Sequence, residues 1–434
     1  MTRAPAKPVA AAGPEGLEVW LDDSSLGPLA HVGRLYRSGQ ESVRFEYDPQ
    51  WLKNPLAFAL DPELGLAVGN YFPKDSNFGI FLDSCPDRWG QVLMKRRELV
   101  EAKQQGRARR ELSVWDFFLG VQDATRMGAL RFSPLQADRK LKAGEAPEFL
   151  DDCLANEALA APALTKIGEL QAVALELTRK KVDDLALLQQ WLKVLVAPGA
   201  SLGGARPKAN LRDGANQLWI AKFPGADDEH DWGLREKLIH DMASEFLHTA
   251  PARVERIGHG FHTFVTQRFD RTAGGDRRFF TSAMALLGKT ASEDASYLDM
   301  ADFIANHGVK AHIAADLREM FRRVMFNVTV ANRDDHLRNH GFIRYAGGWR
   351  PAPAYDMNPS IKKDEHVLAI DDHSPFPDMD TVLITAEFYR VTPQDAKADL
   401  AKLQGILANW ETRAKALGLS VVERAELEDC FMQL

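Results

Sequence analysis

Cysteine is scarce in this sequence, with three residues among 434 and no C-x-x-C pair, so neither a disulfide framework nor a cysteine zinc site is expected. The low count suits a reducing compartment. The sequence lacks apolar runs of the roughly 18 residues that a membrane span needs. Residues 1–16 are rich in alanine and proline and lack the apolar core of a secretion signal, which predicts a disordered tail. These absences favour a cytoplasmic protein without a membrane partner.

Basic residues are also fewer than acidic residues. Lys and Arg number 54 against 61 Asp and Glu, which gives a net charge of −7. Proteins that coat nucleic acid are usually basic, so this role is disfavoured for the chain as a whole, although a local basic patch is still allowed. Hydrophobic residues make up 45% and charged residues 26%, which is ordinary for a globular protein. The length suffices for two or three domains, and the function has to be sought in motifs.

The chemistry is concentrated between residues 332 and 356. Asp334 is followed five residues later by Asn339, and another acidic residue, Asp356, comes after two extended segments. In phosphoryl-transfer enzymes an Asp accepts the proton of the acceptor hydroxyl, and an Asn and a second Asp hold Mg²⁺ on ATP. The D-x-x-x-x-N spacing alone is common by chance, and an ordinary acidic turn explains it equally well.

The two extended segments predict a β-hairpin. They flank Gly347 and Gly348, and glycine tolerates the positive φ that both central positions of a tight hairpin turn require. A turn at these glycines makes Asn339 and Asp356 cross-strand partners about 5 Å apart, close enough to share Mg²⁺. Prolines in the second segment place it at a sheet edge. This symmetry strengthens the phosphoryl-transfer hypothesis.

A glycine-rich loop lies upstream. Residues 199–204 read GASLGG, and successive glycines let backbone N–H groups point at phosphates. A Walker A loop would continue with Lys-Ser/Thr, where this sequence has Ala205 and Arg206. The loop leads instead into a hairpin signalled by an Asp-Gly pair, and Lys222 ends its second strand. A glycine loop followed by a strand lysine that contacts the α- and β-phosphates is the protein-kinase arrangement.

Two further segments fit that arrangement. A helix predicted over 232–248 carries Glu236, which could pair with Lys222 as the kinase helix glutamate does. A strand predicted within 261–271 runs into Gln267 and Phe269, where a kinase hinge would receive adenine. Neither segment identifies the site by itself, because helix glutamates are mostly solvated and aromatic residues often belong to the core.

Other elements are predicted from periodicity. Alternation indicates strands at 17–22 and 42–48, and apolar residues at helical spacing indicate a helix that ends just before Asp334. The polar, proline-dotted residues 134–166 are expected to link two domains. After Asp356 we expect a loop near the substrate over 360–380 and then helices at 393–417 and 421–432.

The order of the motifs resembles that of one family. SLGGARPK, IAKFP, QRFDR, RDDHLRNHGF and AYDMNPS follow one another as in HipA-type serine/threonine kinase toxins, and VWLDDSSLGPL, VRFEYDPQWL and FLDSCPDRWG are similar to the amino-terminal domain of that family. The resemblance implies an α+β, kinase-like two-lobed fold with an additional N-terminal α/β domain and a helical C-terminal lobe. The expected parts are a tail over 1–16, an N-terminal domain over 17–135, a kinase N-lobe-like region over 136–280 and a C-lobe over 281–434.

The resemblance also implies roles for individual residues. Asp334 is the expected catalytic base, Asn339 and Asp356 are the expected Mg²⁺ ligands, and Ser201 matches a serine that such kinases phosphorylate in themselves. The residues expected to bind ATP are Gly203, Gly204, Ala205, Arg206, Lys208, Lys222, Gln267, Phe269, His336 and Tyr355. Gln267 departs from the family pattern, in which a Glu is commoner at this place.

The family implies partners as well. Its members bind a small DNA-binding antitoxin and contact DNA only through that antitoxin. They act in bacterial persistence, and their known targets include aminoacyl-tRNA synthetases. This chain is therefore expected to have such an antitoxin and a protein substrate, with ATP and Mg²⁺ as cofactors.

Two other function classes stay open from the residues alone. A small-molecule phosphotransferase of the antibiotic-resistance kind also uses D-x-x-x-x-N, but usually with His-Gly before the Asp, where this chain has Asn332 and Arg333. An ATP-binding pseudokinase scaffold would act through partners without catalysis. It ranks last, because all the expected catalytic groups are present in the sequence.

Overall fold

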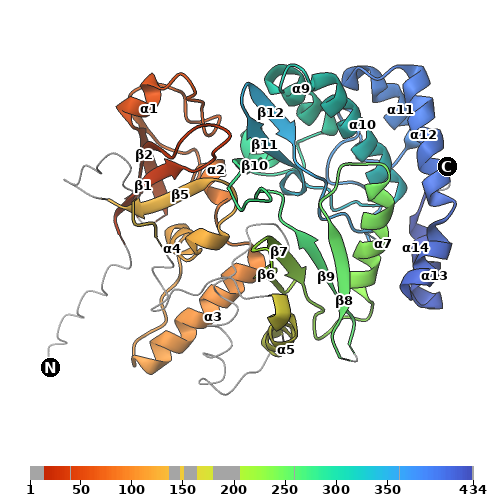
Figure 1. Ribbon diagram of the computed structural model, residues 1–434, viewed down its shortest axis with the longest axis horizontal. Coiled ribbons are helices and arrows are strands. Elements are labelled where there is room, and N and C mark those ends of the chain that lie inside the picture. The colour runs from red at the N-terminus through yellow and green to blue at the C-terminus, as the bar shows by residue number, and fades with distance from the viewer. Residues whose placement is uncertain are drawn as a thin grey trace, which may run out of the picture.

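The computed structural model describes residues 14–39, 41–135, 147–150, 164–178, 206–258, 260–360 and 362–432. Within these ranges the chain forms three antiparallel sheets and a set of helices, arranged as an N-terminal unit, a central sheet and a helical C-terminal lobe (Figure 1). Ser201, Gly203, Gly204, Ala205 and most of the expected linker lie outside the described residues.

The N-terminal unit is a five-stranded sheet with four α-helices among its described residues. The strand order is β4-β3-β2-β1-β5, so the last strand pairs with the first. The strands are β1 (Gly16–Leu21), β2 (Ala30–Ser38), β3 (Ser42–Tyr47), β4 (Asn70–Tyr71) and β5 (Leu130–Pro134). The helices are α1 (Pro49–Lys53), α2 (Gly79–Leu82), α3 (Arg88–Gln104) and α4 (Val114–Leu119). β1 and β3 confirm the two strands predicted from alternation.

The central sheet has the strand order β6-β7-β9-β8. Its strands are β6 (Lys208–Arg212), β7 (Leu218–Lys222), β8 (Ala252–Arg256) and β9 (His262–Gln267), and its helices are α5 (Ile167–Thr178) and α7 (Trp232–Ser244). The predicted hairpin is confirmed, with a loop over 213–217. The helix α7 approaches β9 so closely at Gly233 that a Cβ there would lie 2.2 Å from the carbonyl oxygen of His262. Glycine therefore allows the packing that presents α7 to the sheet.

The C-terminal lobe is built around α10 (Ile313–Thr329), whose buried face follows the predicted helical spacing. Its sheet has the order β10-β11-β12, with β10 (Phe280–Ser282), β11 (Gly341–Tyr345) and β12 (Gly348–Pro351). The other α-helices described are α8 (Ala283–Leu286), α9 (Tyr297–His307), α11 (Met379–Ile384), α12 (Pro393–Leu407), α13 (Trp410–Leu417) and α14 (Val421–Cys430).

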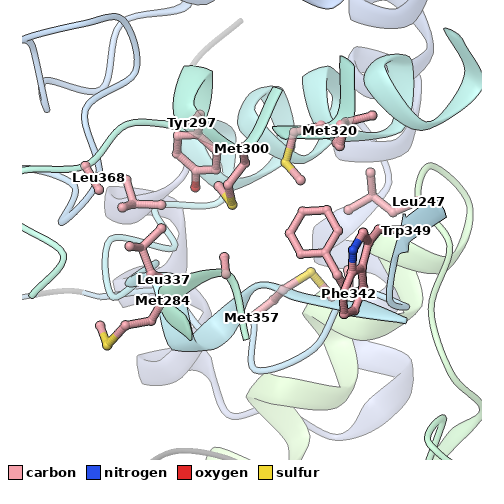
Figure 2. Close-up of a cluster of buried hydrophobic side chains, with 14 of the residues drawn as sticks. Leu247, Met284, Tyr297, Met300, Met320, Leu337, Phe342, Trp349, Met357 and Leu368 are labelled. Atoms are coloured by element: carbon pink, nitrogen blue, oxygen red, sulfur yellow. The ribbon is translucent and has the colours of Figure 1, made fainter. Parts of the chain in front are cut away.

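The core of this lobe anchors both loops that carry predicted site residues. Figure 2 shows Leu337, which follows Asp334, and Met357, which follows Asp356, within one cluster of buried side chains. Met300 of α9 and Met320 of α10 belong to the same cluster. Because apolar burial contributes about 1.5–3 kcal/mol for a side chain of this size, these contacts hold the two loops on the helices beneath them.

Buried carboxylates join the N-terminal unit to the rest of the chain. Asp83 accepts hydrogen bonds from the backbone N–H of Ser282 at 2.6 Å and from the hydroxyl of Thr281 at 3.0 Å. In the opposite direction, Asp270 accepts one from the backbone N–H of Gly128 at 2.8 Å. The unit is therefore fixed against both the central sheet and the C-terminal lobe.

The hairpin register corrects one prediction. The turn lies at Ala346 and Gly347, one residue earlier than expected, because Gly347 takes the left-handed φ of 86° while Ala346 keeps a negative φ. Tyr345 consequently pairs with Gly348, and the ladder does not make cross-strand partners of the two expected Mg²⁺ ligands. The second strand does lie at the edge of its sheet, as its prolines predicted.

The helix predicted over 393–417 is a second correction. It is two helices, α12 and α13, which are interrupted at residues 408–409. The final helix, α14, lies within the range predicted for it.

Candidate active site

A cleft lies between the central sheet and the C-terminal lobe. Its walls come from β7, α7, β9 and residues 354–357. Ile220, Phe264 and Met357 line it, together with Phe269 and Tyr355, whose rings lie 5.4 Å apart. Apolar walls with a few charged groups are the usual form of a small-molecule pocket.

Lys222 stands at the charged part of this cleft. Its Nζ lies 2.6 Å from Glu236 Oε1 and 2.6 Å from Asp356 Oδ1, so the helix glutamate and the lysine do form an ion pair, and Asp356 shares it. Burial opposes the charged form of Lys222, but the attraction of Asp356 and Glu236 raises its pKa well above the usual value. Lys222 is therefore a fixed cation.

The two carboxylates differ in their surroundings. Burial raises the pKa of Glu236, against the attraction of Lys222. Burial also opposes ionisation of Asp356, yet Lys222 and Lys208 together hold its pKa below the usual range. Asp356 has a φ of 55°, a conformation that non-glycine residues enter rarely and often at functional sites. Asp356 is thus an ionised carboxylate in a strained backbone conformation.

Lys208 approaches the same region from β6. Its Nζ lies 2.9 Å from Asp87 Oδ2, and the two side chains are 3% and 4% exposed. Asp87 also caps the N-terminus of α3 by accepting from the backbone N–H of Gly90 at 2.8 Å. The N-terminal unit therefore supplies a buried carboxylate beside the cleft.

The two adjacent aspartates after α10 differ sharply in exposure. The carboxylate of Asp335 is buried, accepts from the hydroxyl of Tyr297 at 2.5 Å and lies 2.7 Å from His366 Nδ1. The side chain of Asp334 is 59% exposed and lies 2.6 Å from Lys363 Nζ. A group arriving from solvent can therefore reach Asp334, whereas Asp335 holds the loop in place.

The oxygen atoms near Asp356 suit Mg²⁺. The side-chain amide of Asn339 donates to the carbonyl oxygen of Asp334 at 2.8 Å, and its buried Oδ1 has no hydrogen-bond partner among the described residues. The hydroxyl of Tyr355 donates to the carbonyl oxygen of Arg338 at 2.8 Å and so ties the segment before Asp356 to the one before Asn339. An orphaned amide oxygen and an ionised carboxylate are ligands of the kind that Mg²⁺ prefers.

The remaining predicted ATP contacts occupy three environments. Gln267 and Phe269 line the cleft, and Gln267 Nε2 donates to Gln217 Oε1 at 3.3 Å. His336 has a buried Nδ1 without a hydrogen-bond partner in the part of the chain that the structure describes. Arg206 is engaged elsewhere, because it pairs with Asp228 at 2.5 Å. The roles of these residues in binding ATP stay predictions.

Sequence reasoning missed several partners of the site. It did not identify Asp87 as the partner of Lys208, Lys363 as the partner of Asp334, or Tyr297 and His366 as the partners of Asp335. None of these pairs has a characteristic spacing. The one signal was positional, since Lys363 and His366 lie in the loop expected near the substrate.

Two family models match this chain. The model described as HipA N-terminal domain matches residues 17–133, and the model described as HipA-like C-terminal domain matches residues 200–423. A curated relative, "Putative kinase Y4mE" of Sinorhizobium fredii (strain NBRC 101917 / NGR234), is 25% identical over 217 residues. That match spans 47% of this chain and 44% of the relative, so less than half of the relative's length is covered.

One solved structure shows the same fold over most of its length. HipA of Shewanella oneidensis MR-1, from a complex with HipB and its operator DNA, matches with a TM-score of 0.62 and 16% identity over 95% of this chain and 94% of that chain. The proinflammatory kinase CtkA of Helicobacter pylori matches with a TM-score of only 0.32 and 12% identity, over 51% of this chain and 94% of that chain. The predicted fold class is confirmed by the first match and by the sheets and helices described above.

None of the helices in the described part of the chain combines the length and the apolar character that a membrane crossing requires.

Proposed function

The chain belongs to the HipA family, and we propose that it is a protein kinase that transfers the γ-phosphoryl group of ATP to serine or threonine hydroxyls, as the toxin of a toxin–antitoxin pair. The kinase name of its curated relative and the HipB complex of its structural neighbour agree with this proposal. The neighbour's complex also supports a small DNA-binding antitoxin as partner, through which the chain would meet DNA.

The observation that carries the proposal is the double ion pair of Lys222. In protein kinases a strand lysine that contacts the α- and β-phosphates must pair with a helix glutamate, and a nearby Asp must hold Mg²⁺. Here Lys222 Nζ lies 2.6 Å from both Glu236 and Asp356, beside an apolar cleft. This arrangement joins β7 and α7, whose paired residues are 14 positions apart, to Asp356, which lies 134 positions after Lys222.

The described residues divide the chemistry among themselves. Asp334, the exposed carboxylate, accepts the proton as the acceptor oxygen forms its bond to the γ-phosphorus, and the bond from that phosphorus to the β-γ bridging oxygen breaks to release ADP. Lys222 holds the α- and β-phosphates. Asn339 Oδ1 and Asp356 would hold Mg²⁺, which neutralises the charge of the phosphates. Asp335 keeps Asp334 in position through Tyr297 and His366.

The same proposal includes regulation and targets that follow from the family. Phosphorylation of Ser201 would place about −1.5 to −2 charge in the glycine-rich loop and disfavour ATP there. A translation-related protein such as an aminoacyl-tRNA synthetase is the proposed class of substrate. Mapping phosphosites after incubation with Mg-ATP tests the first point, and an unmodified Ser201 in an active enzyme would contradict it.

Calorimetry with ATP tests the proposed site directly. We expect ATP binding to depend on Mg²⁺ and to weaken greatly in Asp356→Ala, because the substitution removes a metal ligand and a partner of Lys222. Asp372→Ala, at an exposed acidic residue of the C-terminal lobe, is the matched control and should bind normally. Equal affinity with and without Mg²⁺ would contradict the assignment of Asp356.

A further inference from the structure

A second lysine lies against the expected catalytic base. Lys363 Nζ is 2.6 Å from Asp334 Oδ1, and the two side chains are 43% and 59% exposed. Lys363 belongs to the segment that follows Asp356, and neither the motifs nor the double ion pair of Lys222 accounts for it. An exposed ion pair by itself contributes little to stability, so the fold does not depend on this contact.

The backbone beside Lys363 is docked on the loop that carries Asp334. The carbonyl oxygen of Lys363 accepts a hydrogen bond from the guanidinium of Arg333. Three and four residues later, His366 Nδ1 lies 2.7 Å from Asp335, and the backbone N–H of Val367 donates to Asp335 at 2.9 Å. The side chains of Asp335 and His366 are fully buried. The position of Lys363 is therefore set by contacts on both sides of the exposed pair.

This position places an ammonium group at the acceptor side of the reaction. A general base lies about 2.6–3.2 Å from the hydroxyl whose proton it accepts, and the oxygen of that hydroxyl attacks the phosphorus. An ammonium 2.6 Å from the base is within reach of the oxygens of the transferring phosphoryl group. Lys222 is held on the other side by Glu236 and Asp356, where the α- and β-phosphates are expected.

We propose that Lys363 is a catalytic residue, which contacts the transferring phosphoryl group and orients Asp334. In the transfer, the acceptor oxygen bonds to the γ-phosphorus, the bond to the β-γ bridging oxygen breaks with its electron pair leaving on ADP, and the acceptor proton moves to Asp334. Lys363 keeps its proton and donates to the phosphoryl oxygens, which places positive charge where the transition state needs it. This role rests on the proposed kinase function.

The test compares neighbouring lysines in the full-length chain. Lys363→Met removes the charge but keeps most of the side-chain length, and Lys362→Met is the matched control because Lys362 is the adjacent exposed lysine. The assay follows ADP formed from Mg-ATP, with heat-treated bacterial lysate protein supplying the acceptors. The amount of ADP formed measures transfer to any acceptor. The rate of ADP formation by Asp334→Asn is subtracted as background.

We expect Lys363→Met to lower kcat about 100-fold while the KM for ATP changes less than about threefold, as for the loss of one preorganised donor to a transition state. Lys363→Arg should recover at least roughly a tenth of the wild-type rate, because it restores the charge but not the shape of an ammonium group. Lys362→Met should stay within about twofold of wild type, since its charge lies outside the proposed contact.

Three results would overturn the role of Lys363. An unchanged rate of ADP formation in Lys363→Met would show that the ion pair has no role in the reaction. A faster rate would show that Lys363 inhibits Asp334. If Lys362→Met lowered kcat as much as Lys363→Met does, the effect would come from the overall charge of the segment and not from Lys363 itself. If instead the wild-type chain forms ADP no faster than Asp334→Asn, the proposed function itself fails and the role falls with it.

Discussion

Glu236→Gln tests how the buried charges around Lys222 work together. At 2.6 Å and an effective dielectric constant of about 20, each carboxylate attracts the lysine by about 6 kcal/mol before desolvation is counted. Desolvation of a buried carboxylate offsets much of this attraction. Lys222 also keeps Asp356 as a partner, so the substitution does not orphan the cation. Burial also penalises the ionised form of Glu236 in the folded chain. The expected loss in unfolding free energy is therefore at most about 1.5–3 kcal/mol, the range for a hydrogen bond to a charged group.

The functional loss should be larger than the loss of stability. Without Glu236, Lys222 is drawn to Asp356, where it competes with Mg²⁺ and points away from the phosphates. We expect ADP formation to fall about 100-fold and the Mg²⁺ concentration for half-maximal rate to rise, since the lysine–glutamate pair must be in place for transfer.

Urea unfolding and a Mg²⁺ titration of ADP formation measure the two effects. Asp241→Asn is the matched control, because Asp241 lies on the same helix in a more exposed i,i+4 pair with Lys237, which is worth only about 0.3–0.5 kcal/mol. A Glu236→Gln chain with the wild-type rate and Mg²⁺ dependence would refute the functional meaning of the ion pair.

Two further predictions concern the stability that other buried charges contribute. Asp87→Asn keeps a good helix cap but weakens the buried contact with Lys208. Because Lys208 still interacts with the charge of Asp356, urea unfolding should show a loss of about 1–3 kcal/mol in unfolding free energy. Arg268 and Arg271 hold the pKa of Asp270 well below its usual range in spite of burial. The ionised carboxylate of Asp270 therefore stabilises the fold above its unfolded-state pKa, and this contribution is lost as the pH falls through its folded-state pKa. The difference in unfolding free energy between wild type and Asp270→Asn should be largest near neutral pH and should become smaller below about pH 3.9. A difference that does not change with pH would contradict this prediction.

Local sequence signals predicted the elements that carry the site. The spacing of apolar residues defined α10, and the Asp-Gly pair marked the hairpin that ends in Lys222. Both signals work because periodicity and turn chemistry are properties of neighbouring residues. The pairing of Lys222 with Glu236 came from the kinase arrangement that these elements suggested.

The hairpin register could not be fixed in the same way. Two adjacent glycines allow more than one turn, and Ala346 is acceptable at a position where the backbone keeps a negative φ. The geometric argument that paired Asn339 with Asp356 across a ladder was therefore wrong. The structure ties their segments through the hydroxyl of Tyr355 instead.

Contacts between charged residues that are distant in the chain were the least predictable. Asp87 and Lys208 are separated by 121 residues, Asp334 and Lys363 by 29, and neither pair has a spacing that a motif records. Whether an aspartate is exposed, as Asp334 is, or buried, as Asp335 is, depends on the tertiary packing around it. Adjacent residues of the same type can therefore have different roles that the sequence does not separate.

Phosphoproteomic mass spectrometry of bacteria that express this chain tests the central claim most directly. The comparison is between the wild-type chain and Asp334→Asn, whose exposed position should leave folding intact. We predict new phosphoserine or phosphothreonine sites on host proteins with the wild-type chain and none of them with Asp334→Asn. Identical phosphoproteomes from the two strains, with both chains folded and binding Mg-ATP, would contradict phosphoryl transfer by Asp334.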